Sequence, residues 1–272
     1  MASFGQLKLK KVADLPNKMY ETSGLALYKN KYLITHNDGG NKSEVYVLNK
    51  QGEEIHTVNV KDTKNRDWED LAMDPSGRLF IGDFGNNMNN REKCQIYILP
   101  SNFVEKKSVE PKKITFTYED QKKFPPKKEN RHFDCEAFFW KDGKLYLITK
   151  CRTKPFTGIA KIYELPDKPG KHVAKLKGHI QLCKSGWRFC SVTAADYDAK
   201  TNTLAILTYS KMYLIRNFEG VKFWKGKMKS YSLPFIKQRE AICFKGKNSW
   251  YMTDEYKKGL KGGNLYTLEL KK

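Results

Sequence analysis

The sequence predicts an all-β protein, a five-bladed β-propeller, because three short phrases recur five times in the same order along its 272 residues. The first phrase begins an apolar stretch, at Ser23, Glu69, Glu136, Thr193 and Glu240. The second is an apolar run that ends in Thr or Gly, at residues 32–35, 79–82, 146–149, 205–208 and 250–253. The third carries a central tyrosine, at residues 45–48, 96–99, 162–165, 212–215 and 265–268. A period of roughly 45 to 65 residues built from short strands is typical of propeller blades.

The third repeat shows how one blade is expected to form. Residues 137–140 are apolar, an Asp-Gly pair at 142–143 supplies a hairpin turn, and residues 145–149 return as a second strand. Residues 159–165 and 172–176 complete four antiparallel strands. We expect the innermost strand to be apolar on both faces, because neighbouring blades cover both of them.

The last repeat ends near Leu270 and leaves no room for an outer strand. Residues 7–12 (LKLKKV) alternate apolar and basic side chains and precede the first repeat. We therefore expect this N-terminal strand to complete the last blade and to close the ring, within a single domain that spans residues 1–272. A six-bladed ring is the alternative, and it would need a sixth repeat.

The composition limits the classes of protein to which the chain can belong. No apolar run approaches the about 20 residues of a membrane-spanning helix, so we expect no membrane span. The six cysteines form no CxxC pair, which disfavours a structural zinc site. Cys183 and Cys190 can form a local disulfide if the protein is exported. Export with its signal removed is slightly favoured over a cytoplasmic location.

The formal net charge of +21 attracts polyanions such as nucleic acid or anionic polysaccharide. The lysines are scattered through all five repeats, and this spread favours a solvated surface over a nucleic-acid interface. A polyanionic partner is therefore an alternative to a small anionic substrate, and we expect a monomer.

The residues that begin the inner strands are expected to circle the central axis. Ring closure would bring together Ser23, Glu69, Glu136, Thr193 and Glu240. Three converging carboxylates are costly to bury unless they are neutralised. A hard cation with oxygen ligands would do this, so the ring predicts a Ca²⁺ site, with Mg²⁺ as the alternative ion. In the opposing interpretation the carboxylates protonate or pair with arginines in the preceding loops, at Arg66, Arg131, Arg188 and Arg239.

A second shell should follow the second strand of each blade, on the same face as the ring. Its acidic members, Asp38, Asp83 and Asp254, are the candidate general bases for activating a water molecule. Polar and basic residues of this face are the candidates for holding an anionic substrate: His36, Asn37, Asn86, Lys150, Arg152, Arg239, Arg66 and Arg131. The Gly- and Asn-rich loop at residues 82–91 also has a structural interpretation, as a tight loop.

The order Ser, Glu, Glu, Thr, Glu at five inner-strand starts resembles the calcium-activated nucleotidase (apyrase) family. The matching stretches are residues 23–25, 68–71, 135–140, 192–194 and 239–242. The resemblance implies a five-bladed propeller with a central Ca²⁺ held by Glu and Ser side chains, and hydrolysis of nucleoside di- and triphosphates. Lys150 and Arg152 fall where that family has basic residues. The first-blade loop at residues 37–41 lacks the arginine that the family pattern has after paired acids.

The chain also resembles, more loosely, uncharacterised bacterial propellers that share the phrases Asp-Trp-Glu-Asp and Gly-Asp-x-Gly-Asn-Asn. These phrases occur here at residues 67–70 and 82–87, and they suggest a bacterial protein. Six-bladed gluconolactonase- and paraoxonase-type calcium propellers share the same ring logic.

These observations favour a calcium-dependent hydrolase of an anionic ester or phosphoanhydride, apyrase-like or lactonase-like. Ca²⁺ would be held by Glu69, Glu136 and Glu240 with Ser23 and Thr193. The alternative is a non-enzymatic propeller with a structural calcium, which binds a protein or a polyanionic partner.

Overall fold

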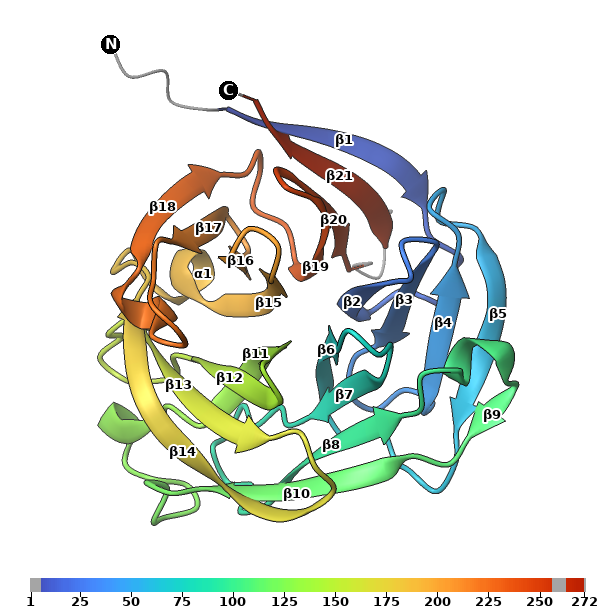
Figure 1. Ribbon diagram of the computed structural model, residues 1–272. Coiled ribbons are helices and arrows are strands. Elements are labelled where there is room, and N and C mark those ends of the chain that lie inside the picture. The colour runs from blue at the N-terminus through green and yellow to red at the C-terminus, as the bar shows by residue number, and fades with distance from the viewer. Residues whose placement is uncertain (1–5, 256–262, 272) are drawn as a thin grey trace.

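The chain forms a ring of β-sheets around a central axis, as Figure 1 shows. The computed structural model describes residues 6–255 and 263–271, and within them 21 strands form four hydrogen-bonded sheets. The predicted all-β propeller class is therefore confirmed. None of the helices in these two ranges is long and apolar enough to cross a membrane.

The innermost strand of each repeat lies next to the axis (Figure 1). These strands are β2 (Thr22–Tyr28), β6 (Trp68–Met73), β11 (Asp134–Lys141), β15 (Val192–Asp198) and β19 (Arg239–Gly246). Each contacts its two neighbours in the closed order β2-β6-β11-β15-β19 and back to β2, and β6 also contacts β15. The sequence repeats thus become a continuous inner wall.

The remaining strands follow outward from the axis in antiparallel order. The second strands are β3 (Tyr32–Asn37), β7 (Leu79–Asp83), β12 (Lys144–Lys150), β16 (Thr203–Thr208) and β20 (Ser249–Asp254). The third strands are β4 (Glu44–Leu48), β8 (Cys94–Leu99), β13 (Ile159–Pro166), β17 (Lys211–Arg216) and β21 (Asn264–Leu270). The outer strands are β5 (Glu54–Val60), β10 (Lys112–Tyr118), β14 (Gly170–Gln181), β18 (Lys227–Ser232) and β1 (Leu7–Asp14), with the short β9 (Ser108–Val109) beside β5. Short helices occupy Phe103–Glu105 (η1), Lys128–Asn130 (η2), Trp187–Cys190 (α1) and Phe223–Lys225 (η3).

The number of sheets differs from the expected number of blades because two outer strands pair directly. β10 runs parallel to β14, from Ile114 opposite Gly170 to Tyr118 opposite Ala174. This pairing joins two four-stranded groups into one sheet of eight, in the order β11-β12-β13-β14-β10-β8-β7-β6. Five blades therefore stay a prediction from the repeats, whereas hydrogen bonds define four sheets.

The two ends of the described chain meet in one sheet, as the sequence predicted. β1 pairs antiparallel with β21, from Leu7 opposite Leu270 to Asp14 opposite Asn264, and the sheet order is β1-β21-β20-β19. Leu7 and Leu9 pack against the apolar cluster that contains Trp250 and Leu268. The N-terminal strand thereby closes the ring by backbone hydrogen bonds and by apolar burial.

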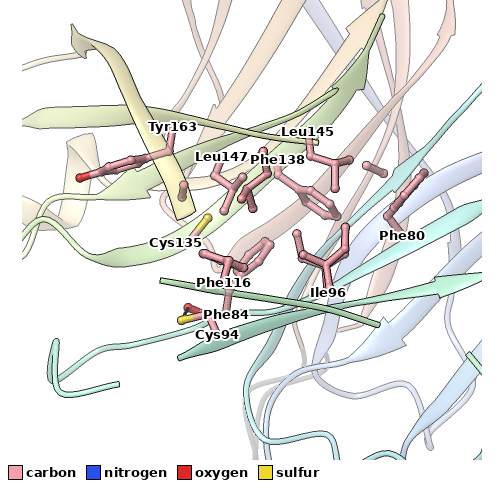
Figure 2. Packing of buried hydrophobic residues seen from close by; sticks show 14 of the residues in the cluster. Phe80, Phe84, Cys94, Ile96, Phe116, Cys135, Phe138, Leu145, Leu147 and Tyr163 are labelled. Carbon is pink, nitrogen blue, oxygen red and sulfur yellow. Dashed lines mark hydrogen bonds between the residues drawn. The ribbon is translucent and has the colours of Figure 1, made fainter. Parts of the chain in front are cut away.

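Apolar side chains fill the space between neighbouring sheets, and β11 is buried on both faces. Phe138 packs with Phe80 and Phe84 on one side, in the cluster of Figure 2. Its neighbour Phe139 belongs to the cluster on the other side, which includes Tyr146. This confirms that the inner strand is sandwiched between two sheets. The buried free thiols Cys94 and Cys135 lie within the first cluster and serve as packing residues there (Figure 2).

A disulfide joins Cys183 to Cys190, a pair whose state the sequence left open. It ties the segment between β14 and α1 to the last residue of α1. Cys190 is buried, whereas Trp187 at the start of α1 keeps 41% of its surface exposed. The bridge therefore holds an exposed indole close to the start of an inner strand.

Two aspartates, the buried Asp70 and the half-buried Asp196, connect the inner strands to one another. The carboxylate of Asp70 in β6 accepts hydrogen bonds from the backbone N–H groups of Leu71 (2.8 Å), Phe138 in β11 (3.1 Å) and Ala195 in β15 (3.3 Å). Asp196 in β15 likewise accepts from Phe244 of β19 at 2.7 Å. Burial raises the pKa of Asp70 well above its ordinary value and that of Asp196 to about 7. These carboxylates satisfy N–H groups that the ladders leave open.

We expect Asp70→Ala to lower the free energy of unfolding by about 3 kcal/mol or more, because it leaves three buried N–H groups without acceptors at roughly 1 to 3 kcal/mol each. Urea unfolding followed by tryptophan fluorescence measures the change. Glu110→Ala, at an exposed position, is the matched control. A loss below about 1 kcal/mol for Asp70→Ala would show that the axis does not depend on this carboxylate.

Candidate metal and anion site

Each inner strand carries a β-bulge near its start. Its pairing with the second strand skips one residue, and the five skipped residues are Gly24, Glu69, Glu136, Thr193 and Glu240. A bulge leaves its extra residue outside the ladder and re-aims its side chain, which is why bulges recur next to active sites. The four side chains are buried, with exposed fractions of 7% or less. The same local device therefore presents one residue from each repeat at one end of the axis.

The bulge moves the first member of the predicted ring by one residue. Ser23 pairs with His36, and the skipped residue is Gly24. The Ser23 hydroxyl donates a 2.5 Å hydrogen bond to the backbone carbonyl of Glu69, so it ties β2 to β6. Gly24 has φ of +71°, and a Cβ there would lie 2.8 Å from Nε2 of His36 and from the amide nitrogen of Leu71. At this position of the ring the first repeat therefore has no side chain, whereas the sequence predicted the hydroxyl of Ser23.

Glu136 is neutralised by two basic side chains. Its Oε2 lies 2.9 Å from Nζ of Lys150, and its Oε1 lies 3.2 Å from Nη2 of Arg152. Arg152 also binds Asp134 through Nε, at 2.5 Å. The cations come from the end of β12 and the residues after it, not from the loop before β11. Basic side chains, and not a metal ion, therefore neutralise Glu136. The partners are Lys150 and Arg152, whereas the sequence suggested arginines in the loops before the inner strands.

Aromatic rings surround these two cations. Nζ of Lys150 lies 3.2 Å from the hydroxyl of Tyr209, and both cations face the indole of Trp187, at 5.7 Å for Lys150 and 5.4 Å for Arg152. Burial lowers the pKa of Lys150, but the carboxylate of Glu136 outweighs it and keeps the pKa well above its ordinary value. Lys150 is therefore a permanent buried cation with an aromatic wall.

A second acidic cluster lies beside the ring and has no such neutralisation. One carboxylate oxygen each from Asp38, Asp67 and Glu69 lie within 4.8 Å of one another. Asp38 follows β3, Asp67 precedes β6, and Glu69 is the bulge residue of β6. A Cβ on Gly85 would collide with the carboxylates of both Asp67 and Glu69, so the glycine makes room for them. We call Asp38, Asp67 and Glu69 the acidic triad.

The electrostatics of the acidic triad disfavour three bare charges. Burial, and then the nearby carboxylates of Asp38 and Asp134, raise the pKa of Asp67 to about 6. Burial, and then Glu136 and Asp38, raise the pKa of Glu69 well above its ordinary value. No ion pair joins the triad to a lysine or arginine within the described residues. Three converging carboxylate oxygens fit the donor preference of Ca²⁺ or Mg²⁺, so the residues present can hold such an ion.

The triad overlaps only in part with the predicted metal ligands. Glu69 was expected as a ligand and Asp38 as a general base, whereas Asp67 was not identified. A signal for Asp67 was present, because it lies two residues before Glu69 in the Asp-Trp-Glu-Asp phrase. The phrase places Asp67 close to Glu69 along the chain, but the bulge at Glu69 interrupts the alternation that would give the direction of the two side chains.

Glu240 lies at the ring, but the preceding arginine is turned away from it. The guanidinium of Arg239 is buried and donates to the backbone carbonyls of Tyr209 (2.6 Å), Phe235 (2.7 Å) and Pro234. Burial raises the pKa of Glu240 well above its ordinary value, and the neighbouring Glu255 adds to the rise against the opposing effect of Lys150. Burial likewise raises the pKa of Glu255 to about 8. Glu255 is a further acidic residue that the sequence did not single out.

Asp83 and Asp254 occupy equivalent places in their repeats and are engaged in hydrogen bonds. Asp83 pairs with Arg91 at 3.1 Å, and the hydroxyl of Tyr97 lies 3.4 Å from its other oxygen. Asp254 accepts a 2.8 Å hydrogen bond from the hydroxyl of Tyr266. In both repeats the carboxylate at the end of the second strand accepts a hydrogen bond from the tyrosine hydroxyl of the third strand. This contact accounts for the tyrosine in these two repeats, whereas Tyr163 donates to Asp120 at 2.9 Å and the hydroxyl of Tyr213 has no partner within the described residues.

His36 and Asn37 are buried in the first repeat. The imidazole packs edge-on against Trp68 with a centroid distance of 5.5 Å, and burial lowers the pKa of His36 to about 4. The side-chain amide of Asn37 donates to the carbonyl of Lys18 at 2.7 Å. Both side chains are therefore enclosed by protein.

Three further residues predicted to contact the substrate, Asn86, Arg66 and Arg131, are not members of the acidic triad. The backbone N–H of Asn86 donates to Asp134 at 2.7 Å, and its side-chain amide donates to the carbonyl of Phe133 at 3.0 Å. This confirms the structural interpretation of the Gly- and Asn-rich loop. Arg66 is exposed, and Arg131 is half-buried.

Thr193 is buried at the ring, and its hydroxyl has no hydrogen-bond partner within the described residues.

Comparison with known proteins identifies the fold. No family model matches the chain, and no curated protein matches it. Among solved structures, a PQQ-bound aldose sugar dehydrogenase from Streptomyces coelicolor matches with a TM-score of 0.57 and 9% identity, over 98% of this chain and 99% of that chain. A putative gluconolactonase matches with 0.51 and 11%, over 99% and 93%. The Malassezia sympodialis allergen Mala s 1 matches with 0.50 and 13%, over 92% and 77%. At these identities the likeness shows the fold alone, and the resemblance to nucleotidases stays a prediction.

We expect the two glutamates of β6 and β11 to respond oppositely to substitution. Glu69→Gln removes an unpaired buried charge, so in EDTA it leaves the melting temperature unchanged or raises it, and it abolishes the increase on adding Ca²⁺. Ca²⁺ at 100 times Kd would stabilise the wild type by about 2.7 kcal/mol. Glu136→Gln leaves the buried Lys150 without its carboxylate partner and leaves Arg152 with Asp134 as its remaining carboxylate partner, so it should cost about 3 kcal/mol with or without Ca²⁺. A Ca²⁺ shift that survives in Glu69→Gln would exclude the triad as the metal site.

The pH dependence of stability should have an unusual sign in the metal-free protein. The folded pKa values of Asp67 and Glu69 lie above their unfolded values, so the folded state binds more protons between about pH 4 and pH 6 and above. The free energy of unfolding should therefore fall as pH rises through this window. Ca²⁺ requires the deprotonated ligands, so its stabilising shift should grow from pH 5 to pH 7. Melting temperatures with EDTA and with Ca²⁺ at pH 5, 6 and 7 measure both trends, and a Ca²⁺ shift that does not vary with pH would contradict them.

Proposed function

We propose that the chain is a divalent-cation-dependent hydrolase of a small anionic ester or phosphoanhydride. The observation that carries the proposal is the acidic triad, an unneutralised carboxylate cluster beside a buried cation pair. Separated negative and positive groups at one end of the axis suit a substrate that bridges a metal ion and a basic side chain.

Asp38, Asp67 and Glu69 would hold the cation, with Ca²⁺ preferred over Mg²⁺ because the predicted ring resembles a calcium site. When bound, such an ion acts as a Lewis acid toward the oxygen on which negative charge develops. This assignment moves the metal away from Glu136, since Lys150 and Arg152 already neutralise that carboxylate.

Arg152 and Lys150 would orient the anionic part of the substrate. Arg152 is the more accessible of the two, with 18% of its side chain exposed against 4% for Lys150. Its contacts with Asp134 and Glu136 fix the guanidinium plane before the substrate arrives, and a preorganised donor costs little reorganisation.

Glu240 and Glu255 would accept the proton of the attacking water. Burial raises the pKa of both carboxylates, that of Glu255 to about 8, so each binds a proton more strongly than an ordinary carboxylate does. Among the residues predicted for this task, Asp83 and Asp254 already accept hydrogen bonds from tyrosine hydroxyls. We therefore assign Asp83 and Asp254 a structural role and not that of a general base.

The fold neighbours support a hydrolase at a coarse level only. One neighbour is a putative gluconolactonase and another is an aldose sugar dehydrogenase. Proteins with a similar fold therefore include enzymes. The alternative, a non-enzymatic propeller with a structural cation, is favoured by the same hydrogen bonds of Asp83 and Asp254. Turnover decides between the two.

The test is hydrolysis of nucleoside di- and triphosphates, aryl phosphates and lactones, each with Ca²⁺, Mg²⁺ or EDTA. We expect turnover that requires the cation and that falls about 100-fold in Glu69→Gln, because a ligand is lost. Arg152→Lys keeps the charge but loses the planar fork, so it should raise KM about tenfold.

Glu110→Gln serves as the exposed control, and Asp254→Asn as the buried control that lowers stability while the folded fraction keeps its turnover. If the cation raises the melting temperature but no substrate class is hydrolysed, the hydrolase proposal is wrong and the cation has a structural role.

A further inference from the structure

An open groove separates two outer strands on the rim of the ring. It has a volume of about 980 Å³ and lies between the end of β18 with the residues that follow it and the start of β1. In Figure 1 the arrows of β18 and β1 follow one another in the same rotational sense around the ring. Within the described residues each of them pairs with one strand only, β17 and β21 respectively. Both therefore present a free backbone edge to the groove.

The corresponding gap between β10 and β14 is closed. There the last residues of one outer strand pair in parallel with the first residues of the next, over five residue pairs from Ile114 and Gly170 onward. The groove brings together the same parts of two successive outer strands, residues 229–234 and 6–9. The strands are splayed at this place instead of paired, which leaves room for an additional strand.

A second place on the rim shows a short segment added to an outer strand. β9 has two residues and pairs in parallel with the end of β5, with Asn59 opposite Ser108 and Val60 opposite Val109. The outer strands of this fold thus accept extended backbone from outside their own repeat.

The groove has an apolar floor and a basic rim. Leu7, Leu9, Tyr231 and Leu233 belong to or pack against one apolar cluster, and all four line the groove. The charged residues in its lining are Lys8, Lys229 and Lys271, and it contains no aspartate or glutamate among the described residues. Successive side chains of a strand point to opposite sides. An inserted strand would therefore turn alternate residues toward the floor and toward the lysines.

We propose that this groove binds an extended acidic segment of a partner protein by β-strand addition. The segment would place apolar side chains on Leu7, Leu9 and Leu233, and would place glutamate or aspartate opposite Lys8 and Lys271. The backbone edges of β18 and β1 supply hydrogen bonds, and the alternating pockets supply specificity. The inference is independent of the acidic triad and of any hydrolase activity.

The test uses a fluorescein-labelled capped peptide of about seven residues that alternates glutamate with valine, long enough to span the groove at about 3.3 Å per residue. Fluorescence anisotropy measures its affinity for the full chain. The variant is Lys8→Glu with Lys271→Glu. The control is Lys112→Glu with Lys113→Glu, because these exposed lysines lie on β10, which already has partners on both edges.

We expect saturable binding that the groove variant weakens about tenfold and the control leaves unchanged. Amide hydrogen exchange in residues 6–10 and 228–233 should slow when the peptide binds, and a peptide with N-methylated valines should bind at least about tenfold more weakly. Three results would each overturn the proposal. They are equal binding by variant and control, binding without slower exchange in β18 and β1, and displacement of the peptide by a single-stranded oligonucleotide that protects the same residues.

Discussion

Burial of carboxylates along a narrow axis is the constraint on which the structure depends. Five inner strands converge there, and a charge that enters this region must find donors or a counter-ion. Asp70 finds backbone N–H groups on two other inner strands, and Glu136 finds Lys150 and Arg152. The first solution joins strands mechanically, and the second creates a fixed cation pair. Within the described residues no lysine or arginine pairs with the acidic triad, and the one backbone donor to its carboxylates is the N–H of Gly39, which bonds to Asp38.

The bulge at the start of each inner strand turns a repeated framework into a site with different members. A ladder without bulges would point each of these residues along the pleat, toward a neighbouring sheet. The bulge instead presents a glutamate in three repeats, a threonine in one and a glycine in one. The glycine is required where β2 passes closest to His36, so the ring has an asymmetric shape. This asymmetry places the acidic triad beside the first and second repeats and the cation pair beside the third.

The sequence was sufficient for the fold class and the closing strand, because period and alternation are local patterns. The position of a bulge is not such a pattern. Leu25 and Leu71 invite an alignment that puts Ser23 beside Glu69, whereas the ladders put Gly24 there. Ion-pair partners were equally hidden, since Glu136 meets cations from the far end of a hairpin and not the arginine that precedes its own strand. Glu255 gains its importance from groups distant in sequence, such as Asp38 and Lys150, whereas Asp67 joins the nearby Glu69 with the distant Asp38.

Closure through β1 also affects how the chain folds during synthesis. β1 is made first and pairs with β21, the last strand of the described chain, so its partner leaves the ribosome after every other sheet has been made. Contacts that span nearly the whole chain form slowly, and unpaired strand edges aggregate. Lysines on an unpaired strand oppose its pairing with other chains, and β1 carries Lys8 and Lys10 between its apolar residues. We therefore expect the positive charge of β1 to limit aggregation of the chain before the ring closes.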